Sequence, residues 1–265
     1  MTNLQPHIRC NKNDIGKIVL LPGDPARAKL IAEKYLSRSK YISGYREFQS
    51  YTGFYKNIKI SVISTGIGSP STAMATEEVI NLGAKVLIRV GTCGGALKKE
   101  IKVGSIIIPT CSIREEGTTK EYISSEFPAV ADYRVIATIE QAAIEQKYKY
   151  YVGINRTHDA FYGQAKNLTK WGSIYRDPRM KNWAYPLLSS EMECSPVFLI
   201  STLRGIMSGA VLAVNYNPEP LKEIIDGKFK FSTPGTHLDN KEAKASVERA
   251  ITTALEASVK LNDLI

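Results

Sequence analysis

Two junctions in the first third of the chain combine arginine with glycine in a pattern that suits a bound anion. The first is PGDPAR at residues 22–27, where Gly23 lets a ligand approach the backbone ahead of a helix with free N–H groups. The second places Arg89 in the apolar run VLIRVG, followed by the hydroxyl of Thr92 and more glycines. A buried guanidinium is costly unless it meets an anion, which could also be a carboxylate of the protein itself. The glycine-rich turn after Arg89 favours a phosphate-type site shared with Arg27.

A second polar group, SSEMEC at residues 189–194, places Glu191 and Glu193 on either side of Met192. Carboxylates two residues apart on a helix point to different faces, so they are not expected to act as an acid/base pair on one atom. A buried glutamate with neutral neighbours is a good bidentate acceptor for a sugar diol. The alternative interpretation is that both acids complement the N-terminus of the apolar helix that follows.

A third group is THDAFYGQAK at residues 157–166. Aromatic side chains followed by an amide and a cation could stack on a heterocycle and hydrogen-bond to it. His158 and Asp159 are adjacent, so their side chains diverge and the pair does not make a catalytic dyad. The group therefore predicts a base-binding or ring-binding segment.

Two common cofactor patterns fail in detail. The Gly66-Ile67-Gly68 segment follows a predicted strand and opens a helix, but it lacks the third glycine and the later acidic residue of a dinucleotide fingerprint. We interpret it as a tight strand-to-helix turn. The four cysteines are far apart and the chain has three histidines, so we expect no zinc site and no other resident cofactor.

The whole chain has the composition of a globular protein. It has 265 residues, 43% of them hydrophobic, which predicts a single domain over residues 1–265. No apolar run is long enough to span a bilayer, and the N-terminus lacks the apolar core of a signal peptide, so we expect no membrane partner and a cytoplasmic location. Widely spaced free thiols agree with a reducing compartment.

The formal net charge of +9 raises the alternative of a nucleic-acid-binding module. The basic residues are spread along the chain, however, and not concentrated with aromatics on one segment, so we expect no nucleic-acid partner. The densest basic stretch, residues 166–181, is either a lid over an anionic substrate or a solvated loop.

Short apolar runs alternate with helical patterns along the chain. Strands are predicted at residues 17–21, 58–64, 85–90, 103–109, 150–154 and 209–215. Helices are predicted from Pro25, with Asp24 as N-cap, and at residues 69–82, 191–206 and 240–265. This order predicts an α/β protein, a three-layer α/β/α sandwich around a mixed, largely parallel sheet. Ligands of such folds bind at the carboxyl ends of the strands, where the two arginine–glycine junctions and the Gly66-Ile67-Gly68 segment fall.

Taken together, these motifs resemble those of the nucleoside phosphorylase-I family, and within it the uridine phosphorylase branch. The matching stretches are PGDPARAKLIA, YREF, STGIGSPSTAMATEE, LIRVGTCGGAL, EFPAVADY, THDAFYGQ, SSEMECSP and AVN, in the family's order over nearly the whole chain. The resemblance implies reversible splitting of a nucleoside by phosphate into free base and ribose 1-phosphate, without a metal cofactor or covalent enzyme intermediate. It also implies dimers assembled into a ring, usually a hexamer, with active sites shared between subunits.

The resemblance assigns a role to each matching residue. It implies a phosphate cradle of Gly23, Arg27, Arg89 and Thr92, completed by Arg46 from a neighbouring subunit. It implies ribose contacts from Met192, Glu193 and a neighbour's His7, and base contacts from Phe161, Gln164 and Lys166. Arg89, Glu193 and Gln164 would carry the catalysis, and Glu47, Ile67 and Ser71 align with a monovalent-cation site of some members.

The chain also departs from the family pattern around the base. Purine-specific members have a proton-donating aspartate at the position of Asn215. Uridine phosphorylases have an asparagine there, as this chain does. Tyr216 and Lys166 replace two arginines that uridine phosphorylases use, and the segment 161–164 is one residue shorter. The alternatives are therefore a purine nucleoside or methylthioadenosine phosphorylase of the same family, and a nucleosidase that uses water in place of phosphate.

Overall fold

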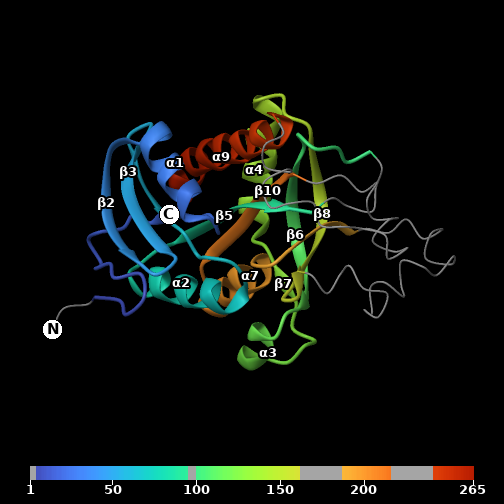
Figure 1. Cartoon of the computed structure of the whole chain (residues 1–265), viewed down its shortest axis with the longest axis horizontal. Helices are drawn as coiled ribbons and strands as arrows, with labels where there is room; N and C mark the ends of the chain where they lie inside the picture. The colour runs from blue at the N-terminus through green and yellow to red at the C-terminus, as the bar shows by residue number, and fades with distance from the viewer. Residues whose placement is uncertain (1–3, 95–99, 162–186, 216–240) are drawn as a thin grey trace, which may run out of the picture.

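The centre of the computed structural model, which describes residues 4–94, 100–161, 187–215 and 241–265, is a ten-stranded mixed sheet (Figure 1). The strands are β1 (Ile18–Leu21), β2 (Ser37–Tyr45), β3 (Phe48–Tyr55), β4 (Ile58–Ile63), β5 (Val86–Cys93), β6 (Ile106–Glu115), β7 (Ala129–Val130), β8 (Tyr150–His158), β9 (Leu187–Glu191) and β10 (Met207–Val214). Their order is β2-β3-β4-β1-β5-β10-β6-β8-β9, and β7 pairs with β6.

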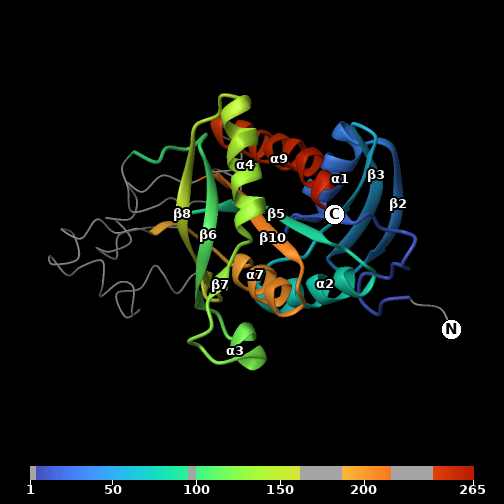
Figure 2. The ribbon, with the colours of Figure 1, turned by 180° about the vertical axis from the view of Figure 1, so that it is seen from behind.

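Helices cover both faces of this sheet, as the views from either side show (Figures 1 and 2). The helices are α1 (Pro25–Tyr35), α2 (Ser69–Asn81), α3 (Thr118–Tyr122), α4 (Tyr133–Glu145), α7 (Cys194–Leu203) and α9 (Lys241–Leu261), followed by the 3-10 turn η2 (Asn262–Leu264). One core packs α2 and α7 against the sheet, and a second packs α1, α4 and α9 against its other face. Alternate residues of β1 enter the two cores, Val19 the first and Leu20 the second. The predicted three-layer α/β/α sandwich is confirmed.

The parallel strands place their carboxyl ends at one edge. β1 runs parallel to β4 and β5, and β5 runs parallel to β10. The first helix begins as predicted, because the Asp24 carboxylate accepts a hydrogen bond of 2.8 Å from the N–H of Ala26 and Pro25 occupies the first turn. The turn between β4 and α2 has Gly66 and Gly68 at positive φ of 73° and 96°, which confirms a tight strand-to-helix turn.

Several element boundaries differ from the sequence prediction, among them β6 (Ile106–Glu115, predicted at residues 103–109) and β8 (Tyr150–His158, predicted at residues 150–154), and two of the differences affect the polar groups described above. The strand predicted to end at residue 90 continues through Gly91 to Cys93, because β10 pairs with it along its whole length. The helix predicted from Glu191 starts at Cys194, since Glu191 ends β9 and pairs in register with Thr157 of β8. Glu191 is therefore a strand residue and not a helix-terminal acid.

The sheet curls so that distant strands meet at one end. β5 and β9 are separated by three strands in the sheet order, yet a bridge joins Gly94 to Ser190, with a hydrogen bond of 3.0 Å from the Gly94 N–H to the Ser190 carbonyl. This contact brings the carboxyl end of β9 beside Arg89 of β5. No helix among the described residues is long and apolar enough to cross a membrane.

Candidate active site

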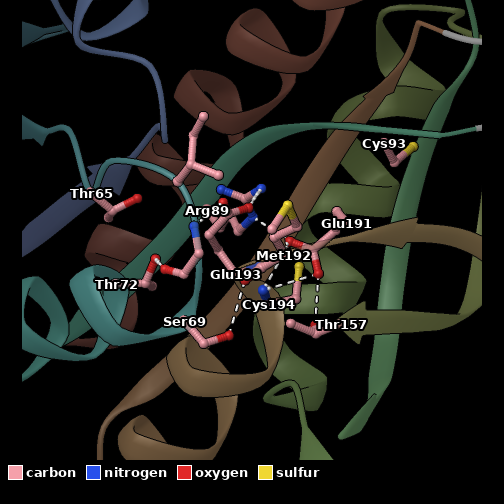
Figure 3. Close-up of polar contacts among 12 residues, drawn as sticks. Thr65, Ser69, Thr72, Arg89, Cys93, Thr157, Glu191, Met192, Glu193 and Cys194 are labelled. Atoms are coloured by element: carbon pink, nitrogen blue, oxygen red, sulfur yellow. Dashed lines mark hydrogen bonds and ion pairs between the residues drawn. The ribbon is translucent and has the colours of Figure 1, made fainter. Parts of the chain in front are cut away.

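Arg89 lies at the centre of the site, between the two carboxylates that flank Met192 (Figure 3). Its Nε donates to Glu191 at 2.8 Å and its Nη2 donates to Glu193. The residue is only 3% exposed. Burial alone would lower the pKa of Arg89, but the adjacent charges of Glu193 and Glu191 raise it above its ordinary value. The guanidinium is therefore a permanent buried cation with two of its nitrogens fixed.

The third nitrogen of Arg89, Nη1, is the one that remains available to bind a ligand. Nη1 is buried and has no hydrogen-bond partner in the part of the chain that the structure describes. It lies beside Gly23, where an added Cβ would be 3.8 Å from Nη1 and 3.0 Å from the carbonyl oxygen of Gly66. A buried charged donor without a partner is costly, and it is satisfied when an anion binds. The pairing of Arg89 with carboxylates is thus observed, and the anion site stays a prediction for which Nη1 is the available donor.

Arg27 adds a second cation next to this nitrogen. Its side chain is half-buried on the first turn of α1 and donates from Nη1 to the carbonyl of Val90 at 3.2 Å. Burial lowers the pKa of Arg27, and the neighbouring charge of Arg89 acts in the same direction while Asp24 opposes it. Two guanidinium groups so close repel each other, and an anion bound between them would relieve that repulsion. The structure brings Gly23, Arg27 and Arg89 together as the sequence predicts.

Glu193 joins the arginine to the turn between β4 and α2. One of its oxygens pairs with Arg89, and the other accepts a hydrogen bond of 2.7 Å from the backbone N–H of Gly68. The Ser69 hydroxyl donates to the carbonyl of Met192 at 3.0 Å, which ties the same two segments together (Figure 3). Burial raises the pKa of Glu193, the Arg89 charge opposes this, and the Glu191 charge adds to it. The carboxylate keeps further lone pairs that could accept from a ligand hydroxyl.

Gly91 makes room for the arginine. A Cβ at this position would lie 2.8 Å from both Cζ and Nη2 of Arg89, closer than real side chains approach. The glycine that the sequence analysis took for a strand end is therefore a strand residue over which the guanidinium folds. Thr92, the next residue of β5, is half-buried.

Two predicted site residues lie apart from the Arg89 cluster. Arg46 is exposed at the tip of the β2–β3 hairpin, with a φ of 53° and its guanidinium 5.5 Å from the centre of the Tyr45 ring. The His7 ring nitrogen Nδ1 is 2.6 Å from the Glu78 carboxylate, near the C-terminal end of α2. Ten residues of helix separate Glu78 from Gly68, which is roughly 15 Å at the α-helical rise. Among the described residues, no hydrogen bond or ion pair joins His7 or Arg46 to Arg89, Glu191 or Glu193.

The residues of the predicted cation site are only partly brought together. A Cβ at Gly66 would lie 2.6 Å from Cγ of Glu47 and 3.3 Å from the Ser71 hydroxyl, so these two side chains meet at the turn. The side chain of Ile67 is 80% exposed. Among the residues described, no three His, Cys, Asp or Glu side chains form a group that could hold a metal ion.

The predicted base-binding segment is described only at its beginning. Phe161 is 49% exposed, where β8 has just ended. Asn215 follows β10, and its N–H donates to the carbonyl of Cys93 at 3.4 Å. Gln164, Lys166, Tyr216 and the basic stretch 166–181 lie outside the described residues.

Sequence reasoning missed four contacts, three of them in the Arg89 cluster. It separated the Glu191 and Glu193 side chains by helical spacing, whereas both bind Arg89, because one ends a strand and the other precedes a helix. It also missed the Gly68 N–H as a donor to Glu193, and Glu78 as the partner of His7. The arrangement as a whole places one unpartnered nitrogen of Arg89 and the neighbouring Arg27 beside the Glu193 carboxylate, which suits an anion next to a polyhydroxyl group.

Comparisons with known proteins agree on one relationship. The sequence profile of the phosphorylase superfamily matches residues 17–259. The uridine phosphorylase of Treponema pallidum is 42% identical over 214 residues, covering 80% of this chain and 82% of that protein. The crystal structure of uridine phosphorylase from Vibrio fischeri matches with a TM-score of 0.81 and 31% identity, covering 97% of this chain and 96% of that one. That of purine nucleoside phosphorylase from Toxoplasma gondii, in complex with immucillin-H, matches with a TM-score of 0.85 and 30% identity over 100% and 99%.

Proposed function

Because this chain belongs to the phosphorylase superfamily, we propose that it is a nucleoside phosphorylase that splits uridine with phosphate into uracil and ribose 1-phosphate. The observation that carries the proposal is the unpaired, buried Nη1 of Arg89 beside Gly23. A hydrolytic enzyme has no anion to place there. The reaction requires no resident cofactor, since phosphate is itself a substrate, and it would take place in the cytoplasm.

Phosphate would bind between the carboxyl ends of β1 and β5. Arg27 and Arg89 supply the charge, Gly23 allows the close backbone approach, and Thr92 offers a hydroxyl. Charge-assisted hydrogen bonds to phosphate are about twice as strong as neutral ones. In the enclosed pocket these groups need no reorganisation during the reaction, so positioning and electrostatics provide most of the catalysis.

Ribose would lie over the phosphate, with its diol on Glu193 and its face against Met192. As the glycosidic bond stretches, the sugar gains oxocarbenium character, as in glycoside hydrolysis. The bound phosphate stabilises this positive charge and then attacks C1′, while the base departs with the bonding electrons. The Glu193 carboxylate is supported for this role by its two fixed partners, Arg89 and the Gly68 N–H.

The departing base would be stabilised by Gln164 and Lys166, with Phe161 against its ring. An amide can pair with a carbonyl and an N–H of uracil at once. Asn215 cannot donate the proton that a purine leaving group requires, and this favours the pyrimidine. Lysine is a point charge without the planar fork of arginine, so the pocket would also admit 5-substituted uracils.

The remaining assigned residues would act on a second copy of the chain. Arg46 and His7 are the two that lie away from the Arg89 cluster, and a neighbouring subunit would use them to complete its phosphate and ribose contacts. We place them in a dimer with shared active sites, with dimers assembled into a hexamer. A monovalent cation held near Glu47, Ile67 and Ser71 would then lie close to Arg46 in sequence and space.

The test is a panel of uridine, inosine and adenosine, each incubated with phosphate, with arsenate and with sulfate, followed by chromatography for the free base. We expect uridine cleavage with phosphate or arsenate only, and a kcat/KM for uridine at least about tenfold above the purines, or about 1.4 kcal/mol. Equal cleavage in sulfate would identify a nucleosidase. Faster cleavage of inosine would favour a purine phosphorylase, the alternative supported by the Toxoplasma gondii match over the whole chain.

A further inference from the structure

A closed ring of polar side chains lies behind Glu191, on the side away from Arg89. Ser112 of β6, Asn155 of β8 and Ser189 of β9 occupy one register row across the sheet. Thr157 stands two residues beyond Asn155 on the same face of β8 and pairs in register with Glu191. Asn155 and Thr157 are fully buried at 0% exposure, and Ser112 and Ser189 are buried with them.

The hydrogen atoms of this ring can be assigned without ambiguity. An ionised carboxylate only accepts, so Asn155 must turn its amide nitrogen toward Glu191, at 2.8 Å from Oε1. The Thr157 hydroxyl must also donate to Oε1, at 2.7 Å. Ser112 therefore donates its hydrogen to Thr157 at 2.7 Å and accepts one from the Asn155 amide at 2.9 Å. Two side-chain donors of the ring, the Asn155 amide and the Thr157 hydroxyl, therefore end on Glu191.

The Asn155 amide is itself held in place from the other side. Its carbonyl oxygen accepts a hydrogen bond of 2.8 Å from the Ser189 hydroxyl. A rotated amide would present its oxygen to the Glu191 carboxylate and lose the hydrogen bond to Oε1, and the Ser189 hydroxyl would have to reverse from donor to acceptor. Ser189 thus fixes the orientation that Glu191 requires.

These contacts hold both oxygens of the Glu191 carboxylate. Oε1 receives Asn155 and Thr157, Oε2 receives Arg89 Nε and, at 2.8 Å, the Glu193 N–H, and the Cys194 N–H lies 3.1 Å from Oε1 and 2.9 Å from Oε2. Burial raises the pKa of Glu191, but the Arg89 charge and these hydrogen bonds lower it below its ordinary value, so the group stays ionised. With both oxygens held, the carboxylate cannot rotate, and Arg89 Nε meets an acceptor in one fixed direction.

We propose that Asn155 is a positioning residue for the reaction, acting through Glu191 to hold Arg89 so that its Nη1 faces the phosphate. The inference rests on the proposed function, because it assigns phosphate to that nitrogen. Without the Asn155 amide, Oε1 loses one of its two side-chain donors and Ser112 loses the donor that orients its hydroxyl. The carboxylate keeps Thr157 and the N–H groups of Glu193 and Cys194, but its Oε1 side is held less rigidly, so the guanidinium that it fixes is positioned less precisely.

The experiment compares Asn155→Ala and the milder Ser189→Ala with the matched control Ser61→Ala. Ser61 is also a fully buried strand serine with two hydrogen-bond partners, the Gly16 N–H at 2.8 Å and the Thr52 hydroxyl at 2.7 Å, but it lies on β4 outside the ring. Each variant is titrated with inorganic phosphate by calorimetry, and KM is measured for phosphate and for uridine separately. Thermal unfolding reports any general loss of stability.

We expect Asn155→Ala to raise the phosphate Kd by about tenfold, and Ser189→Ala to raise it less, as for the loss of a hydrogen bond to a charged group. The rise appears in KM for phosphate and not in KM for uridine. Ser61→Ala lowers the unfolding temperature and leaves both constants unchanged. In a Glu191→Gln background the Asn155→Ala effect shrinks to less than about threefold, because the two residues act in one chain of contacts.

Each result decides the matter. Phosphate constants in both ring variants equal to those of Ser61→Ala would overturn the proposal, as would full additivity with Glu191→Gln. If the wild type binds phosphate but cleaves no nucleoside, the proposed function fails and the calorimetric comparison still decides the role of Asn155. If the wild type binds no phosphate, both fail together.

Discussion

At the residue scale, the two arginines of the anion pocket differ in how far they are tied into the fold. Arg89→Ala leaves Glu191 and Glu193 buried without their cation, so we expect a loss of about 3–5 kcal/mol in the free energy of unfolding. Arg27 is half-buried and donates to a single carbonyl. Arg27→Ala should leave the free energy of unfolding nearly unchanged. It should reduce kcat/KM for phosphate roughly 30- to 150-fold, which corresponds to a loss of about 2–3 kcal/mol in transition-state stabilisation. Urea unfolding and steady-state kinetics on both variants check this, and equal destabilisation by the two substitutions would contradict it.

The buried imidazole of His158 should make the free energy of unfolding depend on pH in the acid range. Burial lowers the pKa of this imidazole from 6.5 to about 4, and the positive charge of Arg156 acts in the same direction. The unfolded chain therefore binds a proton near pH 6.5 that the folded protein accepts only near pH 4, so stability falls as the pH drops through this interval. In His158→Gln this contribution is absent, and the acid-side decline should be shallower. Urea unfolding at about pH 7 and about pH 5 measures the difference; parallel declines in the two proteins would show that His158 does not contribute.

At the scale of elements, β5 has a glycine, Gly91, at the point where the Arg89 side chain folds over the strand. Gly91→Ala would place a methyl group 2.8 Å from Cζ of Arg89 and displace the guanidinium. A misplacement of about 1 Å can reduce a rate on the order of a hundredfold, so we expect a large loss of phosphorolysis. The unfolding temperature should fall as well, because the methyl group would also lie 2.9 Å from the Leu212 side chain and would strain the buried Arg89 ion pairs. Gly94→Ala is the matched control, since its nearest contact would be the Ser190 carbonyl at an ordinary 3.8 Å. Similar activity in both variants would show that Gly91 is not needed for room.

Elements whose ends are set by local sequence features, such as caps and glycine turns, were predicted correctly. Elements that depend on tertiary contacts were not. The β1–α1 junction follows from Asp24 and Pro25, and the β4–α2 turn from its glycines, because capping and positive φ are properties of the segment itself. The β2–β3 hairpin was missed because Ser37–Tyr45 is a mostly exposed edge strand without apolar alternation. The helix α4 was also missed, although its sequence has an amphipathic pattern, with Val135, Ile139 and Ala142 on the buried face.

The same distinction explains the site. The motif residues Gly23, Arg27 and Arg89 could be placed together because parallel strands end at one edge of the sheet. That Glu191 ends a strand and binds Arg89 depends on its register with β8, which the sequence around it does not encode. One sequence feature could have indicated a polar face at that edge of the sheet. In the strand YYVGINRTH, Asn155 and Thr157 are two residues apart and therefore lie on the same face.

At the scale of the whole molecule, the shared site can be tested by mixing subunits. If Arg46 acts on the neighbour, a dimer of one Arg46→Ala and one Arg27→Ala subunit has one intact site and one doubly defective site. Random reassembly of equal amounts should then restore about a quarter of the wild-type activity. Mixing Arg46→Ala with His7→Ala is the control, because both residues act on the neighbouring site and every mixed site still lacks one of them. Recovery in both mixtures, or in neither mixture once mixed oligomers are verified, would refute the shared arrangement.

The bridge between Gly94 and Ser190 has a consequence for how the protein folds. Arg89 reaches Glu191 across 102 positions of the chain, and the two strands that carry them meet only where the sheet curls onto itself. Contacts of such long sequence separation form after the local ones, because the entropy of closing the loop must be lost before any of them is made. We therefore expect the anion site to be completed late, after the transition state for folding. A ligand bound there stabilises only the finished protein, so phosphate is expected to slow unfolding and to leave the refolding rate unchanged.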